Sequence, residues 1–387
     1  MQVIKPVVIL GLLISSLLAN AEDRGRAYVS NQEGGVSIIN LNTMETEGTI
    51  DIQAKNPRGI GITEDGQYLI TANKDDENLS VIDLKTNQFV KHISVGKNPE
   101  FVRVFRGQVF VSTEPASTGK PPVAGKEDDD KDEPKIPARI AVVDLAKGKK
   151  IRDIVGGPET EGIEFSKSGK EIIVTNEADN TITVHNFSNG KLLKTISTKK
   201  YGDRPRGIKV APNGKYYVST LEYGNNFIVL DSQFKHLKTV PTGESPYGIS
   251  FDREGKRLFV ASSKAKTLEV FDTTNFEKIK EIPTGRRCWH FSFSPDEKDI
   301  LLACGKSDEV LVIDAEKLEV TKRISNKEIP WGIVVYPKAM GSLDSVKEKI
   351  AVYLKSPIFI GLFYFKYFSI NFHSSSVTGV MERRFPF

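Results

Sequence analysis

Short apolar runs, with polar residues at alternate positions, recur along the chain from about residue 27 to residue 336. The runs occur in groups of four, always in the same order. One such group spans residues 56–62, 68–70, 79–83 and 89–95. The second run is rich in β-branched and aromatic residues, the third ends in an acidic or amide residue, and the fourth is more polar. Gly, Asp, Asn and Pro turns separate the runs. This pattern predicts half-buried antiparallel strands in groups of four.

The first run of each unit carries a repeated phrase. Its clearest copies are Asn-Pro-Arg-Gly-Ile-Gly-Ile at 56–62, Arg-Pro-Arg-Gly-Ile-Lys-Val at 204–210, Ser-Pro-Tyr-Gly-Ile-Ser-Phe at 245–251 and Ile-Pro-Trp-Gly-Ile-Val-Val at 329–335. Looser copies lie at 98–104, 159–165 and 287–293. Counted at the glycine position, the seven copies fall at Gly59, Phe101, Gly162, Gly207, Gly248, His290 and Gly332. Four strands recurring about every 42 residues are typical of propeller blades.

The two ends of the repeat region complement each other. The chain begins with a second-type strand at 27–30 and finishes with an isolated first-type strand at 331–336. Pairing these two strands would complete a seventh blade and leave no exposed sheet edge at the junction. The sequence therefore predicts an all-β, seven-bladed propeller over 25–338, closed by strand 331–336. The glycine of the phrase is expected to allow close backbone approach between inner strands.

Three segments fall outside this pattern. The first 21 residues have a basic Lys5, an apolar stretch over 7–18 and Ala19-Asn20-Ala21, which together resemble a cleaved secretory signal. Residues 115–137 are polar and acidic, and we expect a disordered insertion between two strands of one blade. Residues 345–387 are expected to be a poorly ordered extension; the alternative is a membrane anchor. The predicted location is periplasmic or secreted.

Composition adds little to this picture. Cys288 and Cys304 are too few for a disulfide scaffold, and the 54 basic and 50 acidic residues are interspersed. We expect no nucleic-acid partner, no membrane association beyond the signal peptide, and a monomer. The two cysteines lie on neighbouring strands, close to opposite each other, so a disulfide and two buried thiols both remain open.

The repeated motifs resemble the bacterial YVTN-type β-propeller repeat family. They are the Pro-x-Gly-Ile phrase, the second strand Tyr28-Val29-Ser30-Asn31 and the third strand Val81-Ile82-Asp83. The last two copies, at 288–296 and 330–335, are similar to exported propellers associated with pyrroloquinoline-quinone-dependent alcohol catabolism. The resemblance spans about residues 25–344. It implies a propeller and an association with such a system, but no catalytic residues; a link to pyrroloquinoline quinone rests on this resemblance alone.

The residue between the proline and the glycine varies among the copies, and we expect it to line one mouth of the central channel. Its occupants are Arg58, Glu100, Glu161, Arg206, Tyr247, Trp289 and Trp331. Arginines and aromatic faces suit an amphipathic, partly planar ligand. In the alternative, the arginines pair with the glutamates and the tryptophans fill the mouth. A second ring could come from the ends of the second strands, at Asn31, Asn73, Glu114, Glu177 and Glu222, although such side chains more often bind the local backbone.

Signals for catalysis are weak. Histidines do not fall at metal-ligand spacing, and no nucleophile stands beside an oriented base apart from the Cys288–His290 neighbours. We therefore expect no metal and no cofactor, and a binding protein for a protein partner or small ligand in the periplasm rather than an enzyme. The alternatives are a lactonase-like hydrolase, whose metal Glu100, Glu161 and Asn73 would hold, and a structural surface module.

Overall fold

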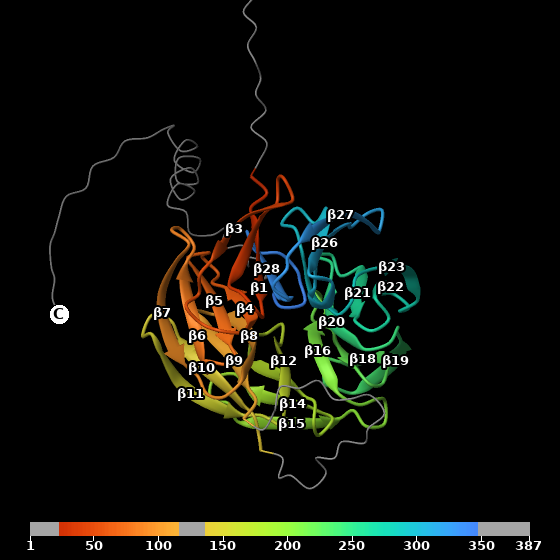
Figure 1. The fold of residues 1–387 in the computed structure, drawn as a ribbon. Coiled ribbons are helices and arrows are strands. Elements are labelled where there is room, and N and C mark those ends of the chain that lie inside the picture. The colour runs from red at the N-terminus through yellow and green to blue at the C-terminus, as the bar shows by residue number, and fades with distance from the viewer. Residues whose placement is uncertain (1–22, 116–135, 347–387) are drawn as a thin grey trace, which may run out of the picture. The chain divides into compact units, whose positions relative to one another are not determined.

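The computed structural model describes residues 23–115 and 136–346, and these residues form a seven-bladed β-propeller (Figure 1). Each blade is a four-stranded antiparallel sheet. Apart from the strands, the described chain contains one short 3-10 helix, Gly305–Ser307. The predicted fold class is confirmed. None of the described helices is long and apolar enough to cross a membrane.

We number the blades by the chain order of their innermost strands. Blade 1 contains β4 (Pro57–Ile62), β5 (Tyr68–Asn73), β6 (Asn78–Asp83) and β7 (Gln88–Ser94). Blade 2 contains β8 (Pro99–Phe105), β9 (Gln108–Thr113), β10 (Arg139–Asp144) and β11 (Lys149–Val155). Blade 3 contains β12 (Thr160–Phe165), β13 (Glu171–Asn176), β14 (Thr181–Asn186) and β15 (Leu192–Ser197). Blade 4 contains β16 (Pro205–Val210), β17 (Tyr216–Leu221), β18 (Asn226–Asp231) and β19 (His236–Pro241).

The remaining blades continue the same order. Blade 5 contains β20 (Pro246–Phe251), β21 (Arg257–Ser262), β22 (Thr267–Asp272) and β23 (Lys278–Pro283). Blade 6 contains β24 (Cys288–Phe293), β25 (Asp299–Cys304), β26 (Glu309–Asp314) and β27 (Glu319–Ser325). Blade 7 contains β28 (Pro330–Tyr336), β1 (Arg26–Asn31), β2 (Val36–Asn40) and β3 (Glu45–Ile50).

Blade 7 joins the two ends of the ring. Its inner strand β28 pairs antiparallel with β1, with Ala27 opposite Val335 and Val29 opposite Ile333. These four side chains are buried. The predicted closure, by strands about 300 residues apart in the sequence, is therefore present (Figure 1).

The glycines of the repeated phrase lie where inner strands approach each other. A Cβ at Gly59 would collide with the backbone oxygen of Glu100 on the next inner strand. A Cβ at Gly248 would meet the backbone oxygen of Trp289 in the same way. The expected close approach is confirmed.

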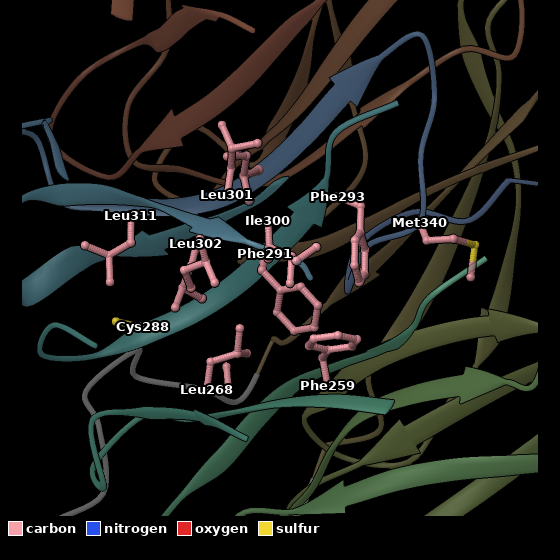
Figure 2. Packing of buried hydrophobic residues seen from close by; sticks show 14 of the residues in the cluster. Phe259, Leu268, Cys288, Phe291, Phe293, Ile300, Leu301, Leu302, Leu311 and Met340 are labelled. Atoms are coloured by element: carbon pink, nitrogen blue, oxygen red, sulfur yellow. The ribbon is translucent and has the colours of Figure 1, made fainter. Parts of the chain in front are cut away.

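The hydrophobic core lies between neighbouring blades. Figure 2 shows this packing at blades 5 and 6, where Phe259 faces Phe293 with ring centroids 5.1 Å apart. Leu268 and Leu302 extend the same fully buried cluster, which also includes Met340 from beyond the last strand. Blade-to-blade contact thus buries the face that one four-stranded sheet would leave exposed.

Several predicted features fall on parts of the chain that are not described. The signal peptide at 1–21, most of the insertion at 115–137 and nearly all of the extension at 345–387 lie outside the described residues. The insertion does fall between β9 and β10, the second and third strands of blade 2. The described chain also continues beyond the predicted propeller end at 338, and residues 339–346 stay in contact with the propeller.

Candidate functional site

The variable residues of the repeated phrase lie at the starts of the inner strands, around one mouth of the channel. In its charged half, Arg58 pairs with Glu100, and Arg206 pairs with Glu161. Only 18% of the Arg58 side chain and 10% of the Arg206 side chain are exposed. The pairing that was one alternative for these residues is therefore the arrangement in the structure, and both guanidinium groups already bind carboxylates.

Arg206 is the centre of a larger buried network. Its Nε donates to Glu222 at 2.7 Å, its Nη1 also pairs with Glu177, and its guanidinium carbon lies 4.7 Å from the centre of the Tyr247 ring. Arg204, which sequence reasoning did not select, pairs with Glu177 and lies within 3.7 Å of Glu222. Arg204 directly precedes the proline of its copy, two residues before Arg206. This second arginine in the repeated phrase could have indicated from the sequence that Arg204 belongs to the network.

The second predicted ring divides into two groups. Asn31 and Asn73 end their strands, and the Asn73 amide donates to Asn78 and Ser80 in its own blade at 2.8 Å each. Glu114, Glu177 and Glu222 lie one residue beyond the ends of their strands. A shift of one residue sends a side chain to the opposite face of a strand. Asn73 therefore binds side chains within its own blade, while the glutamates join the mouth network.

The mouth network contains more acidic than basic groups. Six carboxyl groups interact there with four cationic groups: Glu100, Glu114, Glu159, Glu161, Glu177 and Glu222, with Arg58, Lys74, Arg204 and Arg206. Glu222 also interacts with Arg287. Oε2 of Glu100 and Oε1 of Glu114 are buried and have no hydrogen-bond partner among the described residues. Burial raises the pKa of Glu114 well above its ordinary value, and the charges of Glu100 and Glu161 raise it further. Burial and the neighbouring carboxyl groups thus favour the protonated form of Glu114.

An aromatic layer crosses the channel below the mouth. Phe101 of blade 2 and His290 of blade 6 occupy the glycine position of their copies and meet edge to face, with centroids 6.2 Å apart. His290 also contacts Tyr247 at 5.4 Å and Trp331 at 4.4 Å between ring centroids. Trp331 is almost fully buried, whereas Trp289 is half-buried. Of the predicted aromatic ring, Trp331 and Tyr247 fill the channel and Trp289 stays nearer the surface.

The far end of the channel is covered by residues 339–346, which we call the cap segment. Ser342 binds Phe291 of blade 6, the Leu343 carbonyl accepts from Arg103 of blade 2 at 2.7 Å, and the Asp344 carbonyl accepts from Lys209 of blade 4 at 2.9 Å. The segment therefore crosses the channel axis.

Under the cap segment lies a buried ion cluster that sequence reasoning did not find. Arg103 donates to Glu164 at 2.8 Å, and Lys209 lies 3.8 Å from the second Glu164 oxygen. Burial lowers the pKa of Lys209 to about 7, with a further contribution from the charge of Arg103. These residues stand three positions after Glu100, Glu161 and Arg206, so the charged copies of the phrase could have located them.

The chemistry available at the channel is limited by these contacts. Burial lowers the pKa of His290 to about 3, with help from Lys209 and Arg206, so its imidazole is neutral at ordinary pH. Cys288 is bonded to Cys304, and is therefore no free thiol beside His290. Among the described residues no group of three or more His, Cys, Asp and Glu side chains is arranged to hold a metal ion.

Two hollows lie on the face that carries the mouth. One, of about 560 Å³, lies between blades 7 and 1 and is lined by residues 32–35, 49–52, 54–56 and Asp75. The other, of about 330 Å³, lies between blades 5 and 6 and is lined by Ser263, Lys264, Lys266, Arg286, Arg287 and Lys306. The second hollow has five basic side chains in its wall.

Comparison with known proteins identifies the fold but not a family. A periplasmic gluconolactonase from Pseudomonas aeruginosa has a TM-score of 0.65 and 14% identity, covering 80% of this chain and 98% of its own. A hydrazine synthase from Kuenenia stuttgartiensis has a TM-score of 0.64 and 18% identity, covering 76% and 93%. A Bacteroides uniformis protein with an unproven assignment as a 6-phosphogluconolactonase has a TM-score of 0.66 and 17% identity, covering 81% and 100%.

Models of protein families and curated protein sequences give no match to this chain. At these sequence identities the structural similarity shows only that the chain has a propeller fold. The function must therefore be argued from the residues at the site.

Proposed function

We propose that this chain is an exported, non-enzymatic binding propeller whose partner or ligand docks at the channel mouth through a group that donates hydrogen bonds. The observation that carries the proposal is the pair of buried carboxyl oxygens, Glu100 Oε2 and Glu114 Oε1, that no described residue satisfies. Buried polar atoms are nearly always partnered, and an unpartnered one needs an explanation. An ammonium or guanidinium group entering the mouth would donate to these oxygens, and its positive charge would favour the ionised form of Glu114.

The charge distribution at the mouth also favours a cationic group as the ligand. Arg58 and Arg206 are occupied by glutamates, so they do not offer free forks to a carboxylate ligand. The amphipathic, partly planar ligand, one of the two alternatives from the sequence, is therefore less well matched than a cationic group. We propose a protein partner that presents a lysine or arginine side chain, or a small amine.

The resemblance to YVTN-type exported propellers suggests where to look for this partner. We propose a periplasmic quinoprotein or its cytochrome as the first candidate, because the last two copies of the phrase resemble propellers associated with pyrroloquinoline-quinone-dependent alcohol catabolism. The pyrroloquinoline quinone would then belong to the partner. Export rests on the signal-like first 21 residues.

A thermal-shift measurement tests the mouth directly. Spermidine and arginine amide should raise the melting temperature of the native chain, and the increase should be lost in Glu100→Gln. The control is Glu316→Gln, which removes the same charge from an exposed turn. Equal shifts in all three chains would refute binding at Glu100.

The partner is tested by biolayer interferometry with a purified quinoprotein alcohol dehydrogenase and its cytochrome. Glu100→Gln should weaken the interaction about tenfold, the size expected for one charge-assisted hydrogen bond. A Trp289→Ala variant should also weaken it, since Trp289 is half-buried beside the mouth. A partner that binds all variants equally would remove the mouth from the binding face.

A lactonase-like hydrolase is the second candidate, favoured by the gluconolactonase among the structural neighbours. It requires turnover, which a binding propeller lacks. Hydrolysis of glucono-δ-lactone above the spontaneous rate, lost in Glu100→Gln, would replace the binding proposal. So would a melting-temperature increase with calcium or zinc that the same substitution abolishes.

A further inference from the structure

A second charged feature lies on the mouth face beside the acid-rich network, and its charge is opposite in sign. It is the hollow of about 330 Å³ between blades 5 and 6. Its wall is formed by three turns: 263–266 after β21, 284–287 before β24, and 305–308 after β25. We call it the basic hollow.

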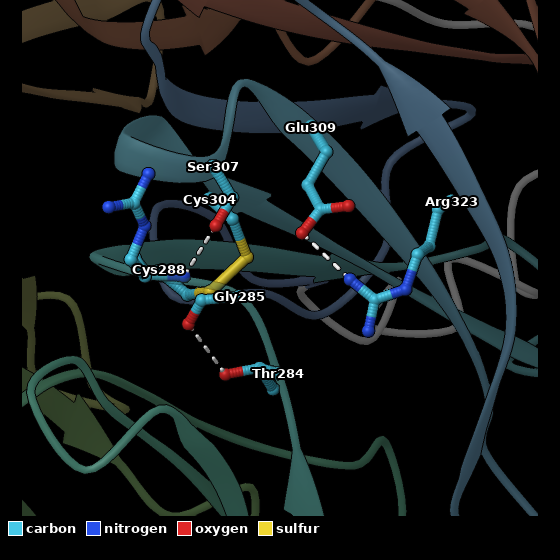
Figure 3. Close-up of a disulfide and its surroundings, with 8 residues drawn as sticks. Thr284, Gly285, Cys288, Cys304, Ser307, Glu309 and Arg323 are labelled. Atoms are coloured by element: carbon cyan, nitrogen blue, oxygen red, sulfur yellow. Dashed lines mark hydrogen bonds and ion pairs between the residues drawn. A yellow bond between two sulfur atoms is a disulfide. The ribbon is translucent and has the colours of Figure 1, made fainter.

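The cations of the basic hollow are largely unpaired. Lys264 has a carboxylate partner, Glu244 at 3.2 Å. Among the described residues, Lys266, Arg286, Arg287 and Lys306 have no carboxylate within ion-pairing distance. The nearby Glu309 pairs with Arg323 at 2.8 Å, as Figure 3 shows, and Arg287 is influenced by the more distant charge of Glu222. Like charges held together in one hollow repel each other, and a bound anion would remove that repulsion.

Hydrogen bonds of the backbone fix the turns that carry these cations. In blade 6, Gly305 N donates to the Arg287 carbonyl at 3.1 Å and Lys306 N donates to the Arg286 carbonyl at 3.2 Å. Arg286 N donates to Ser307 Oγ at 2.7 Å. The turn of blade 5 is fixed by Ser263 N, which donates to the Ser245 carbonyl at 2.8 Å. The side chains are therefore presented by hydrogen-bonded turns rather than by long loops.

The disulfide joins the two cation-bearing turns of blade 6. Cys288 directly follows Arg286 and Arg287, and Cys304 precedes Lys306 by two residues. The two cysteines are opposite each other in the β24–β25 pair and are almost completely buried, with the disulfide close to Ser307 (Figure 3). The cross-link thus fixes the separation of the turns that carry Arg286, Arg287 and Lys306.

We propose that the basic hollow binds a small polyanion, a molecule with two or three carboxylate or phosphate groups, and that the Cys288–Cys304 disulfide holds its cations in register. The volume lies at the lower end of the range for small-molecule sites, roughly 300 to 1,000 Å³. Two adjacent arginines match the planar, two-pronged geometry of carboxylate and phosphate groups. A small molecule fits this hollow better than an acidic protein surface does, because a protein surface could bind exposed cations on a flat face. Arg287 of this site interacts with Glu222 of the mouth network, but the two proposals are tested separately, because the variants that test this site keep both residues.

Isothermal titration calorimetry at low ionic strength tests the site, with citrate and pyrophosphate as separate probes for the carboxylate and phosphate classes. At least one probe should bind in a single saturable step. Arg286→Gln/Lys306→Gln should weaken that binding tenfold or more, because two charge-assisted contacts are lost. The control is Lys298→Gln/Lys317→Gln, which removes the same charge from side chains 78% and 68% exposed in turns at the opposite end of blade 6.

Three outcomes would overturn the small-anion site: no saturable binding of either probe, equal weakening by the control pair, or binding of a polyglutamate peptide but of neither probe. A separate titration tests the role of the disulfide by comparing the native chain before and after reduction. Reduction should weaken binding about threefold or more without unfolding the chain by circular dichroism. A folded, reduced chain of unchanged affinity would remove the disulfide from the proposal.

Discussion

The two ends of the central channel use neighbouring positions of the same repeated phrase, yet they solve the problem of buried charge differently. At the capped end, Arg103, Glu164 and Lys209 bind one another and the carbonyls of the cap segment. Glu164 Oε2 is buried without a hydrogen-bond partner, but it lies 3.8 Å from the Lys209 ammonium group. At the mouth, Glu100 Oε2 and Glu114 Oε1 are also buried without a hydrogen-bond partner, and no cation of the described residues forms an ion pair with Glu114. One cluster is bound by the chain's own backbone, and the other retains capacity for an external donor.

This difference separates construction from binding. Both clusters lie in a low-dielectric interior, where removing charges from water is costly. At the capped end that cost is offset by contacts that also fasten residues 339–346 to blades 2, 4 and 6. At the mouth no equivalent structural gain accompanies the surplus of carboxyl groups.

Removing the cap segment should have the largest effect. A chain that ends at Lys338 loses the buried side chains of Met340 and Leu343 and the carbonyls that accept from Arg103 and Lys209. Two such side chains contribute roughly 1.5–3 kcal/mol each, so the free energy of unfolding should fall by about 5 kcal/mol. Urea unfolding measures the change. The matched control ends at Val346 and should unfold like the full chain.

A change below about 1 kcal/mol in the chain ending at Lys338 would mean that the cap segment does not stabilise the ring. The contacts of the capped end would then not offset the cost of its buried charges. Because β28 remains intact in both chains, ring closure itself is not altered by the test.

Breaking the ion cluster should be the next largest effect. Glu164→Gln leaves Arg103 and Lys209 buried side by side without a carboxylate, and such losses cost roughly 3–5 kcal/mol. Replacing the whole cluster, with Arg103→Met, Glu164→Leu and Lys209→Met, should cost less than the single substitution. Chemical denaturation of both variants checks this order. A milder single variant would show that the cluster is solvated in solution.

Sequence predicts the ring better than the site because the two depend on different interactions. Period-two alternation and the glycine phrase reflect contacts that every blade repeats, so seven blades and the β28–β1 closure could be predicted. The pairing of Arg206 with Glu161, Glu177 and Glu222 joins two blades and depends on side-chain direction. The basic hollow joins turns from two blades, and its cations were not grouped by any single motif.

The cap segment illustrates the same limit. Residues 339–346 carry no alternation, so the pattern that predicted the strands ended before them. Their role depends on carbonyl groups, which every residue has, meeting Arg103 and Lys209 on distant strands. By contrast, Phe101 and His290 replace glycine in the repeat, and that irregularity marked the residues that close the channel.

The pH dependence of stability should differ in sign between the two ends. At the capped end, burial lowers the pKa of Lys209 from an ordinary value of 10.5 to about 7. Between these values the unfolded chain holds a proton that the folded chain has released, so this residue makes stability rise with pH across that window. Lys209→Met should remove the rise. Thermal unfolding at intervals from pH 7 to pH 10 measures it, with Lys298→Met as the exposed control.

At the mouth, Glu114→Gln should have the smallest effect and the opposite sign. Burial raises the pKa of Glu114 well above 4.5, so the folded chain keeps a proton that the unfolded chain loses above that pH. Its contribution to stability is therefore complete below pH 4.5 and falls as the pH rises through the raised value. Glutamine copies the protonated carboxyl, so the variant should match the native chain at low pH and be the more stable of the two at higher pH. Parallel profiles for the native chain, Glu114→Gln and the exposed Glu316→Gln measure this difference. If Glu114→Gln instead destabilises the chain at every pH, then Glu114 is ionised and structurally paired. The mouth would then resemble the capped end rather than a site that awaits a partner.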